Sequence, residues 1–165
     1  MFSFSKYNLM HKIFITGGTG CIGSVTIYKL LQSSEVEKIV IATRSNNTAP
    51  LKLWLGEDLD SRLEFVTLDV SNYSEIERIL LEVNPTCIIH LGAYQSPDCA
   101  NDHLGGMHIN LGGTMQLFDV AEKLPNLKRF VFASSAAVYG MRSMYSQEII
   151  HEDVPMAPPN HYGIW

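Results

Sequence analysis

The sequence has 165 residues, of which 46% are hydrophobic and 18% are charged, and its formal net charge is −5. This composition is typical of a single globular domain, and the acidic balance without a basic cluster argues against nucleic acid and anionic membrane surfaces as partners. No apolar run approaches the roughly 20 residues of a membrane-spanning helix, and residues 1–7 lack the continuous apolar stretch of a secretory signal.

The regular structure is expected to begin with a strand, a glycine-rich turn and a helix. Residues 12–15 are β-branched and aromatic apart from one lysine, which predicts a buried strand, and apolar residues recur near helical spacing from Val25 to Leu31. The glycines between them fit G-x-G-x-x-G from Gly18 or G-x-x-G-x-x-G from Gly17. Such a turn lets backbone approach a pyrophosphate, and the free N–H groups of the first helical turn point at that anion. The alternative is a tight turn without a ligand.

The rest of the chain is predicted to alternate strands and helices. Further strands are expected at residues 38–42, 63–68, 86–91 and 127–133. A helix is expected after Ser71 or Asn72, ending at Pro85, and a longer one over residues 101–123. The longer helix is expected to bury Ile109, Leu111, Met115, Leu117, Phe118 and Ala121. Residues 46–62 are expected to form a loop with one helical turn, and residues 134–165 to be mostly loop.

This alternation predicts the α/β class: a Rossmann-like, doubly wound parallel sheet with helices on both faces and strand order 3-2-1-4-5. Ligands of such sheets bind beyond the carboxyl ends of the strands, at the switch in strand order. The polar clusters of this sequence follow the ends of the predicted strands, so we expect one ligand site there.

Several of these clusters resemble motifs of the extended short-chain dehydrogenases/reductases, the group of NAD(P)-dependent nucleotide-sugar epimerases and dehydratases. The matching stretches are TGGTGCIG at 16–23, LDV at 68–70, HLGA at 90–93, NLGGT at 110–114, SSAAVYG at 134–140 and YG at 162–163. The resemblance implies that residues 1–165 are the NAD(P)-binding domain of such an enzyme, truncated after about the fifth strand and without the substrate-binding part. It also implies a nucleotide sugar, or a similar hydroxylated molecule, as substrate of a hydride transfer.

The resemblance assigns most of the cofactor site by position. The residues concerned are Gly17, Gly18, Thr19, Gly20, Cys21, Ile22, Gly23, Asp69, Val70, Leu91, Gly92, Ala93, Asn110 and Ser134. By analogy, Asp69 would bond the adenine edge beside Val70, residues 91–93 would line the ribose and nicotinamide side, and Asn110 would tie its helix to the neighbouring strands.

Ser135 and Tyr162 fall at the family's catalytic positions. A tyrosine near the nicotinamide takes a proton from a substrate hydroxyl, and a serine holds that oxygen in line. A free phenol has a pKa of about 10 and needs a nearby cation to ionise near neutrality, which in the family is a lysine four residues after the tyrosine. That position would be 166, so this chain is expected to lack turnover. The alternative function is a non-catalytic dinucleotide-binding module or truncated pseudoenzyme.

The choice between NAD and NADP is addressed at one place. Dinucleotide folds that prefer NAD carry an acidic residue about 20 residues after the glycines, to accept the ribose 2′-hydroxyl. Here Thr43 and Arg44 occupy that region, and a guanidinium suits a 2′-phosphate. The sequence therefore predicts NADP over NAD, with a solvated loop arginine as the alternative.

Other reactive residues are given structural interpretations. His90 is expected to be a hydrogen-bonded structural histidine, and His103 and His108 lack zinc spacing, so no metal site is expected. Cys21 is expected to fill a variable loop position, with a redox-sensitive thiol as the alternative. The cysteines form no C-x-x-C motif, which favours reduced thiols in a cytoplasmic protein. The apolar residues 130–132 are expected at an exposed sheet edge that promotes a homodimer or aggregation.

Overall fold

The computed structural model describes residues 10–45 and 47–165, so the expectation for residues 1–7 lies outside the described chain. Its centre is a five-stranded parallel sheet in the order β3-β2-β1-β4-β5, as predicted. The strands are β1 (His11–Thr16), β2 (Val36–Thr43), β3 (Leu63–Thr67), β4 (Cys87–His90) and β5 (Arg129–Phe132). The order reverses between β1 and β4, which is where such sheets bind ligands.

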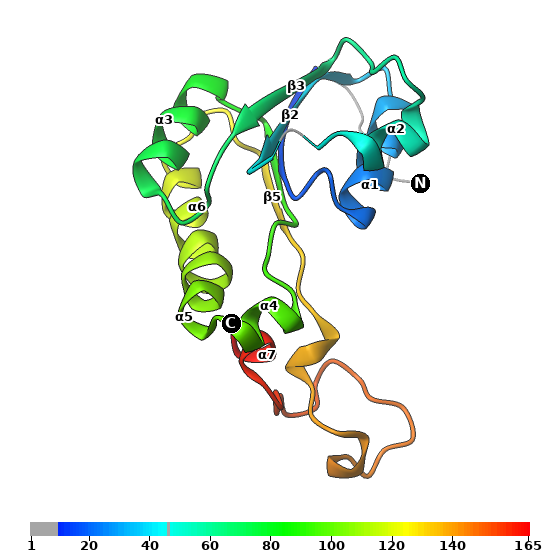
Figure 1. Ribbon diagram of the computed structural model, residues 1–165, viewed down its shortest axis with the longest axis vertical. Coiled ribbons are helices and arrows are strands. Elements are labelled where there is room, and N and C mark those ends of the chain that lie inside the picture. The colour runs from blue at the N-terminus through cyan, green and yellow to red at the C-terminus, as the bar shows by residue number, and fades with distance from the viewer. Residues whose placement is uncertain (1–9, 46) are drawn as a thin grey trace.

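Helices cover both faces of the sheet (Figure 1). On one face, α1 (Cys21–Leu31) and α2 (Ala49–Leu55) pack on a core that includes Ile15, Ile27, Ile41 and Leu51. On the other, α3 (Tyr73–Val83) and α6 (Gly113–Ala121) pack on a core that includes Phe14, Val40, Ile76, Ile88 and Leu117. Successive residues of β1 and β2 thus serve opposite cores, because side chains of a strand alternate between faces. Both strands read as continuous apolar runs for that reason.

The structure extends the sequence expectations at two helices. The predicted single turn in residues 46–62 is α2, a seven-residue helix that buries Leu51 completely. The helix expected near Ser71 or Asn72 begins after Asn72, whose side chain accepts a hydrogen bond from the Glu75 backbone N–H at 3.3 Å. It ends at Asn84, which has the left-handed backbone (φ 46°) common after a helix.

The long helix predicted over residues 101–123 is present, and the chain is helical without interruption from His103 to Ala121. It consists of α5 (His103–Gly106), a π-helical turn η1 (Met107–Gly112) and α6, and the π-helical turn was not predicted. A separate short helix, α4 (Ser96–Asn101), precedes it and was not predicted either. The two are separated at Asp102, whose backbone is extended (φ −139°, ψ 88°) and whose carboxylate caps α5 by accepting from the Gly105 N–H.

The buried face of η1 and α6 also differs from the predicted one. Ile109 and Leu117 are buried and Ala121 is half-buried, but Leu111, Met115 and Phe118 are 47%, 59% and 39% exposed. Small and polar side chains occupy the inward positions instead: Gly106, Asn110, Gly113 and Thr114. A Cβ at position 113 would lie 2.9 Å from the carbonyl oxygen of residue 70, so close approach to the sheet selects this face over hydrophobicity.

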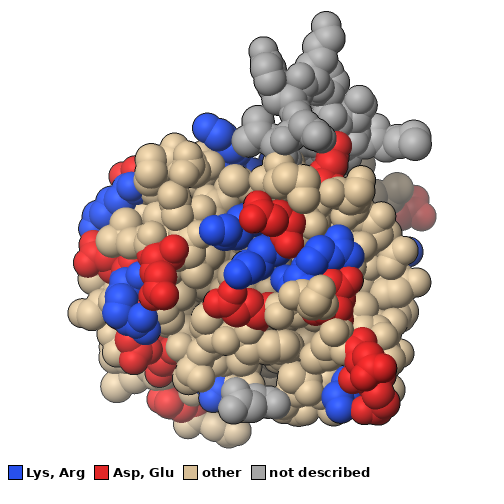
Figure 2. All heavy atoms as spheres, turned by 90° about the horizontal axis from the view of Figure 1, so that it is seen from above, with Lys and Arg blue, Asp and Glu red and all other residues tan. Residues whose placement is uncertain are grey.

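Residues 134–165 extend from the carboxyl edge of the sheet and carry the short helices η2 (Ala136–Val138), η3 (Arg142–Met144) and α7 (His161–Ile164) (Figure 1). Figure 2 views the molecule from above and shows basic and acidic side chains interspersed on that face. Two of the ion pairs in the described chain join Lys38 to Glu64 and Arg62 to Asp60, each at 2.8 Å. Over residues 10–45 and 47–165, no helix combines the length and apolar character needed to cross a bilayer.

Candidate functional site

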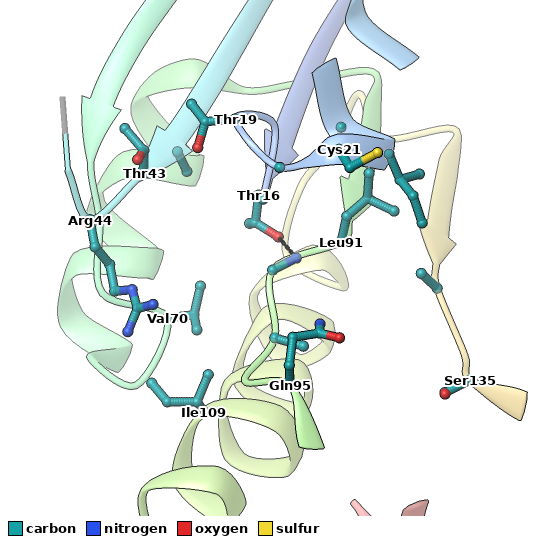
Figure 3. A pocket seen from close by; sticks show the side chains of 18 of the residues that line it. Thr16, Thr19, Cys21, Thr43, Arg44, Val70, Leu91, Gln95, Ile109 and Ser135 are labelled. Carbon is teal, nitrogen blue, oxygen red and sulfur yellow. Dashed lines mark hydrogen bonds between the residues drawn. The ribbon is translucent and has the colours of Figure 1, made fainter. Parts of the chain in front are cut away.

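A cavity of about 770 Å³ lies at the carboxyl ends of the strands (Figure 3). Most residues assigned from the sequence line it: Gly17, Thr19, Gly20, Cys21, Ile22, Gly23, Arg44, Val70, Leu91, Gly92, Ala93, Ser134, Ser135 and Tyr162. Gly18, Asp69 and Asn110 do not, and each has another position in the structure. The cavity runs from the end of β2, past the glycine-rich turn, to the end of β5 and α7, so it joins segments far apart in the chain.

The glycine-rich turn depends on close backbone packing. Gly17 has a positive φ of 69°, and a Cβ there would lie 2.7 Å from the Gly92 nitrogen. A Cβ at Gly23 would lie 2.2 Å from the Gly17 carbonyl oxygen, so no other residue fits at the start of α1. Gly18 is buried beneath the helix, where a Cβ would lie 2.9 Å from Ile41 Cγ2. Gly18 therefore supports the turn from below and does not line the cavity.

The first turn of α1 presents unsatisfied donors to this cavity. Gly20 precedes the helix, and no side chain caps its N–H groups in the described chain. The N–H groups of the first helical turn have no intrahelical acceptor, and the helix dipole adds partial positive charge at this end. Cys21, Ile22 and Gly23 all line the cavity. This end of the cavity can therefore hold an anionic group such as a pyrophosphate without any cationic side chain.

Beneath the turn, His90 belongs to a directed chain of buried hydrogen bonds. Gly92 N–H donates to Thr16 Oγ1 (3.0 Å), which pairs with His90 Nδ1 (2.6 Å). His90 Nε2 pairs with Thr114 Oγ1 (3.0 Å), which donates to the Asn110 carbonyl (2.5 Å). Because the Thr114 hydroxyl donates its proton to the Asn110 carbonyl, its oxygen accepts from His90 Nε2. Nε2 is therefore the donor of the imidazole, and Nδ1 accepts from Thr16. This series of hydrogen bonds requires the neutral form of His90. Burial favours that form, because it lowers the pKa of His90 from 6.5 to about 4. His90 is a structural residue with no free nitrogen for a base.

Asn110 holds the loop after β4 in place. Its Nδ2 donates to the Tyr94 carbonyl (3.0 Å), and its Oδ1 accepts from the Tyr94 N–H (2.7 Å). Asn110 is buried and lines a smaller adjoining cavity of about 230 Å³ rather than the larger one. The side chain therefore ties the π-helical turn to the loop that follows β4.

Asp69 and Arg44 lie near the β2 and β3 ends of the cavity. The Asp69 carboxylate accepts hydrogen bonds from the Ser71 N–H (2.9 Å) and hydroxyl (2.8 Å). These bonds, and more weakly the charge of Arg44, lower the pKa of Asp69. The carboxylate lies outside the cavity lining, whereas Val70 lies in it. Arg44 is the only charged residue lining the cavity among the described residues.

Ser135 and Tyr162 meet at the opposite end. Ser135 Oγ accepts from the Ala137 N–H at 3.2 Å and so begins η2. Tyr162 is carried by α7, which packs so closely on η2 that a Cβ at Gly163 would lie 2.1 Å from the Ala137 carbonyl oxygen. No hydrogen bond joins the two side chains, but both line the same cavity. Such a pair can hold and deprotonate a hydroxyl placed between them once the phenol is ionised.

Several lining residues were not assigned from the sequence: Thr16, Ala42, Thr43, Ser45, Leu68, Gln95, Ile109, Ala133 and Ala136. Ala42, Leu68 and Ala133 end predicted strands and Thr16 and Thr43 directly follow them, so the position of ligands at strand ends could have identified these residues. Gln95 and Ile109 lie directly before α4 and in the π-helical turn, two elements that were not predicted. Within the described ranges, no three histidine, cysteine, aspartate or glutamate side chains gather as a metal cluster.

Comparisons with known proteins identify relatives of this chain. A model of the NAD dependent epimerase/dehydratase family matches residues 13–165. UDP-glucose 4-epimerase of Bacillus subtilis (strain 168) is 32% identical over 152 residues, which cover 92% of this chain and 43% of that protein. The human UDP-glucose 4-epimerase is 29% identical over 138 residues, covering 80% and 39%. The chain thus spans less than half the length of these relatives.

Solved structures give the same picture. The Bordetella bronchiseptica enzyme WbmH in complex with NAD+ superposes with a TM-score of 0.77 at 27% identity, covering 94% of this chain and 49% of that one. The same organism's WbmG, in complex with NAD and UDP, has a TM-score of 0.77 at 27% identity, covering 93% and 46%.

Proposed function

The chain belongs to the NAD dependent epimerase/dehydratase family, and from this premise we propose that residues 1–165 form the NAD(P)-binding domain of an enzyme acting on a nucleotide sugar or a similar hydroxylated substrate. One observation carries the proposal: a single cavity joins Arg44, the glycine-rich turn, Ser135 and Tyr162. Its volume of about 770 Å³ lies within the range of small-molecule and cofactor sites, roughly 300–1,000 Å³.

Each part of the cavity suits one part of a dinucleotide. The glycine-rich turn and the first turn of α1 would hold the pyrophosphate, and Arg44 and Val70 would face the adenosine end. Residues 91–93 and Ser134 would line the nicotinamide end, beside Ser135 and Tyr162. The nicotinamide, when bound, supplies a hydride acceptor or donor. Ser135 would orient the substrate hydroxyl, and the Tyr162 oxygen would take its proton.

For the cofactor, we propose NADP over NAD. The relatives WbmH and WbmG are complexed with NAD, so the preference rests on this chain's own residues. Arg44 is the only charge in the described lining, and no described carboxylate lines the cavity to accept a 2′-hydroxyl. A guanidinium offers a fork of donors that matches phosphate oxygens.

A second candidate function is a module that binds the dinucleotide without turnover. The described lining near Tyr162 has no cation, and a tyrosine needs a nearby positive charge to act as a base near neutral pH.

The cysteines and the sheet edge support two further proposals, on the compartment and on self-association. The three cysteines are free, which supports a reducing compartment such as the cytoplasm. The apolar edge at β5 supports self-association, since Val131 and Phe132 are 41% and 48% exposed.

Titration calorimetry of the folded chain with NAD and NADP tests the proposal. Ile22→Glu places a carboxylate in the first turn of α1, where Ile22 is 69% exposed and lines the cavity. We expect it to weaken both dinucleotides about tenfold or more by repelling the pyrophosphate. Leu53→Glu, on an 86% exposed residue of α2 outside the cavity lining, is the matched control. A folded wild-type chain that binds neither dinucleotide at millimolar concentration refutes the proposed function.

A further inference from the structure

The guanidinium of Arg44 is held by an aromatic ring rather than by an acceptor. It lies over the Tyr94 ring, with Cζ 5.2 Å from the ring centroid, a distance within the range of cation–π contacts. Figure 3 shows the Arg44 side chain directed from the end of β2 toward Val70 and Ile109, along the cavity. No described residue accepts a hydrogen bond from Arg44, so the five N–H donors of its guanidinium have no acceptor among the described residues. Stacking occupies only the face of the guanidinium and leaves these in-plane donors free.

Tyr94 is in turn fixed by its backbone. Asn110, which is only 6% exposed, bonds both the N–H and the carbonyl of Tyr94. The Cys99 thiol also contacts the Tyr94 carbonyl, at 3.7 Å. The ring therefore projects from an anchored stretch of backbone, whereas Arg44 is an exposed residue directly after β2.

From this arrangement we propose that Tyr94 is a specificity-determining residue that positions Arg44 to receive a 2′-phosphate. A free arginine side chain has rotamer entropy that binding would have to remove. A ring that already holds the guanidinium plane in the cavity lowers this cost for a phosphate ligand. A ligand with a 2′-hydroxyl would gain far less, because it offers no matching charge. The inference rests on the proposed function and adds to it the residue that makes Arg44 selective.

Asp69 is the other group near Arg44 that could position its guanidinium in place of the Tyr94 ring. Its charge is close enough to Arg44 for Arg44 to lower the pKa of Asp69. However, its carboxylate is bonded to the Ser71 N–H and hydroxyl and forms no hydrogen bond with Arg44. The Tyr94 ring is therefore the contact that sets the plane of the guanidinium.

Five variants of the full chain test this inference by calorimetry with NADP, NAD, 2′,5′-ADP and 5′-AMP. Tyr94→Leu should weaken NADP and 2′,5′-ADP about three- to fivefold, the range for an exposed cation–π contact, and leave NAD and 5′-AMP unchanged. Tyr94→Phe, which keeps the ring, should match the wild type. Arg44→Lys, which keeps the charge but loses the planar fork, should also lose selectivity. In Arg44→Ala, adding Tyr94→Leu should have no further effect on NADP.

The outcomes separate this inference from the function on which it rests. A folded wild type that binds neither dinucleotide overturns both. Arg44-dependent NADP binding that is unchanged by Tyr94→Leu, or a Tyr94→Leu variant that weakens NAD and NADP alike, overturns the role of Tyr94 alone. If Tyr94→Leu does not fold, Arg44→Lys decides: the wild-type ratio of NADP to NAD affinity in that variant overturns the inference.

Discussion

Replacing His90 by glutamine removes the buried imidazole whose neutral form is required by the hydrogen bonds from Thr16 and to Thr114. Burial lowers the pKa of His90 from 6.5 to about 4. Between these two pH values the imidazole is protonated in the unfolded chain but stays neutral in the folded chain. The stability that this histidine contributes is therefore complete above about pH 6.5 and is lost as the pH falls toward 4. Between pH 7 and pH 5 these two pKa values correspond to about 2 kcal/mol.

Urea unfolding at pH 7 and at pH 5 measures this contribution. We expect His90→Gln to be less stable than the wild type at pH 7 by about 1–3 kcal/mol, because two buried hydrogen bonds change partner. Between pH 7 and pH 5 it should lose about 2 kcal/mol less than the wild type does. His151→Gln, at an exposed histidine, is the control and should follow the wild type. If His90→Gln loses as much stability as the wild type over this interval, then His90 is not neutral in the fold and the assigned tautomer is wrong.

Three further predictions concern the cavity and the sheet edge. Arg44→Ala should weaken NADP binding by about 1–3 kcal/mol and leave NAD nearly unchanged, the range for hydrogen bonds to charged groups; equal losses would contradict the assignment of Arg44. Tyr162→Phe should keep dinucleotide binding but abolish any turnover of a nucleotide sugar, and a rate that survives the change would remove Tyr162 from the proposed chemistry. The wild-type chain should self-associate with rising concentration in light scattering, whereas Val131→Lys on β5 should reduce the measured mass; a wild type that stays monomeric would rule out this edge.

The strands could be predicted because their signal is local. β1, β2 and β4 lie between two helical layers, so each contains a run of three or more consecutive apolar residues that marks the strand directly. The glycine-rich turn was equally readable, because Gly17 and Gly23 are required by backbone distances within one short segment. For the helix after β4, the same reasoning failed. Leu111, Met115 and Phe118 are the apolar residues at helical spacing, but Gly113 faces inward against Val70 and Thr114 faces inward to pair with His90.

In the candidate site too, features with a local signal in the sequence were predictable and contacts between distant segments were not. The resemblance to the family assigned residues 91–93 and Ser135, and the distance from the glycines assigned Arg44; all of them follow strand ends and line the cavity. The contacts that connect these residues were not predictable. The stack of Arg44 on Tyr94 joins the segments that follow β2 and β4, on either side of β1, and Ile109 lines the cavity from a π-helical turn. Neither leaves a periodic or spaced pattern in the chain.

The contact between α7 and η2 fixes the distance between these two helices. At Gly163 a Cβ would lie 2.1 Å from the Ala137 carbonyl oxygen, so a single added methyl group must push the two helices apart by about 1 Å. Tyr162 precedes this glycine directly, so the phenol oxygen would be displaced with the helix. Displacements of about 1 Å can lower a reaction rate by roughly 100-fold. The tolerance of position 163 to substitution therefore reports how accurately the phenol must be placed: a protein that only binds a dinucleotide can accept alanine there, whereas one that transfers a proton through Tyr162 cannot.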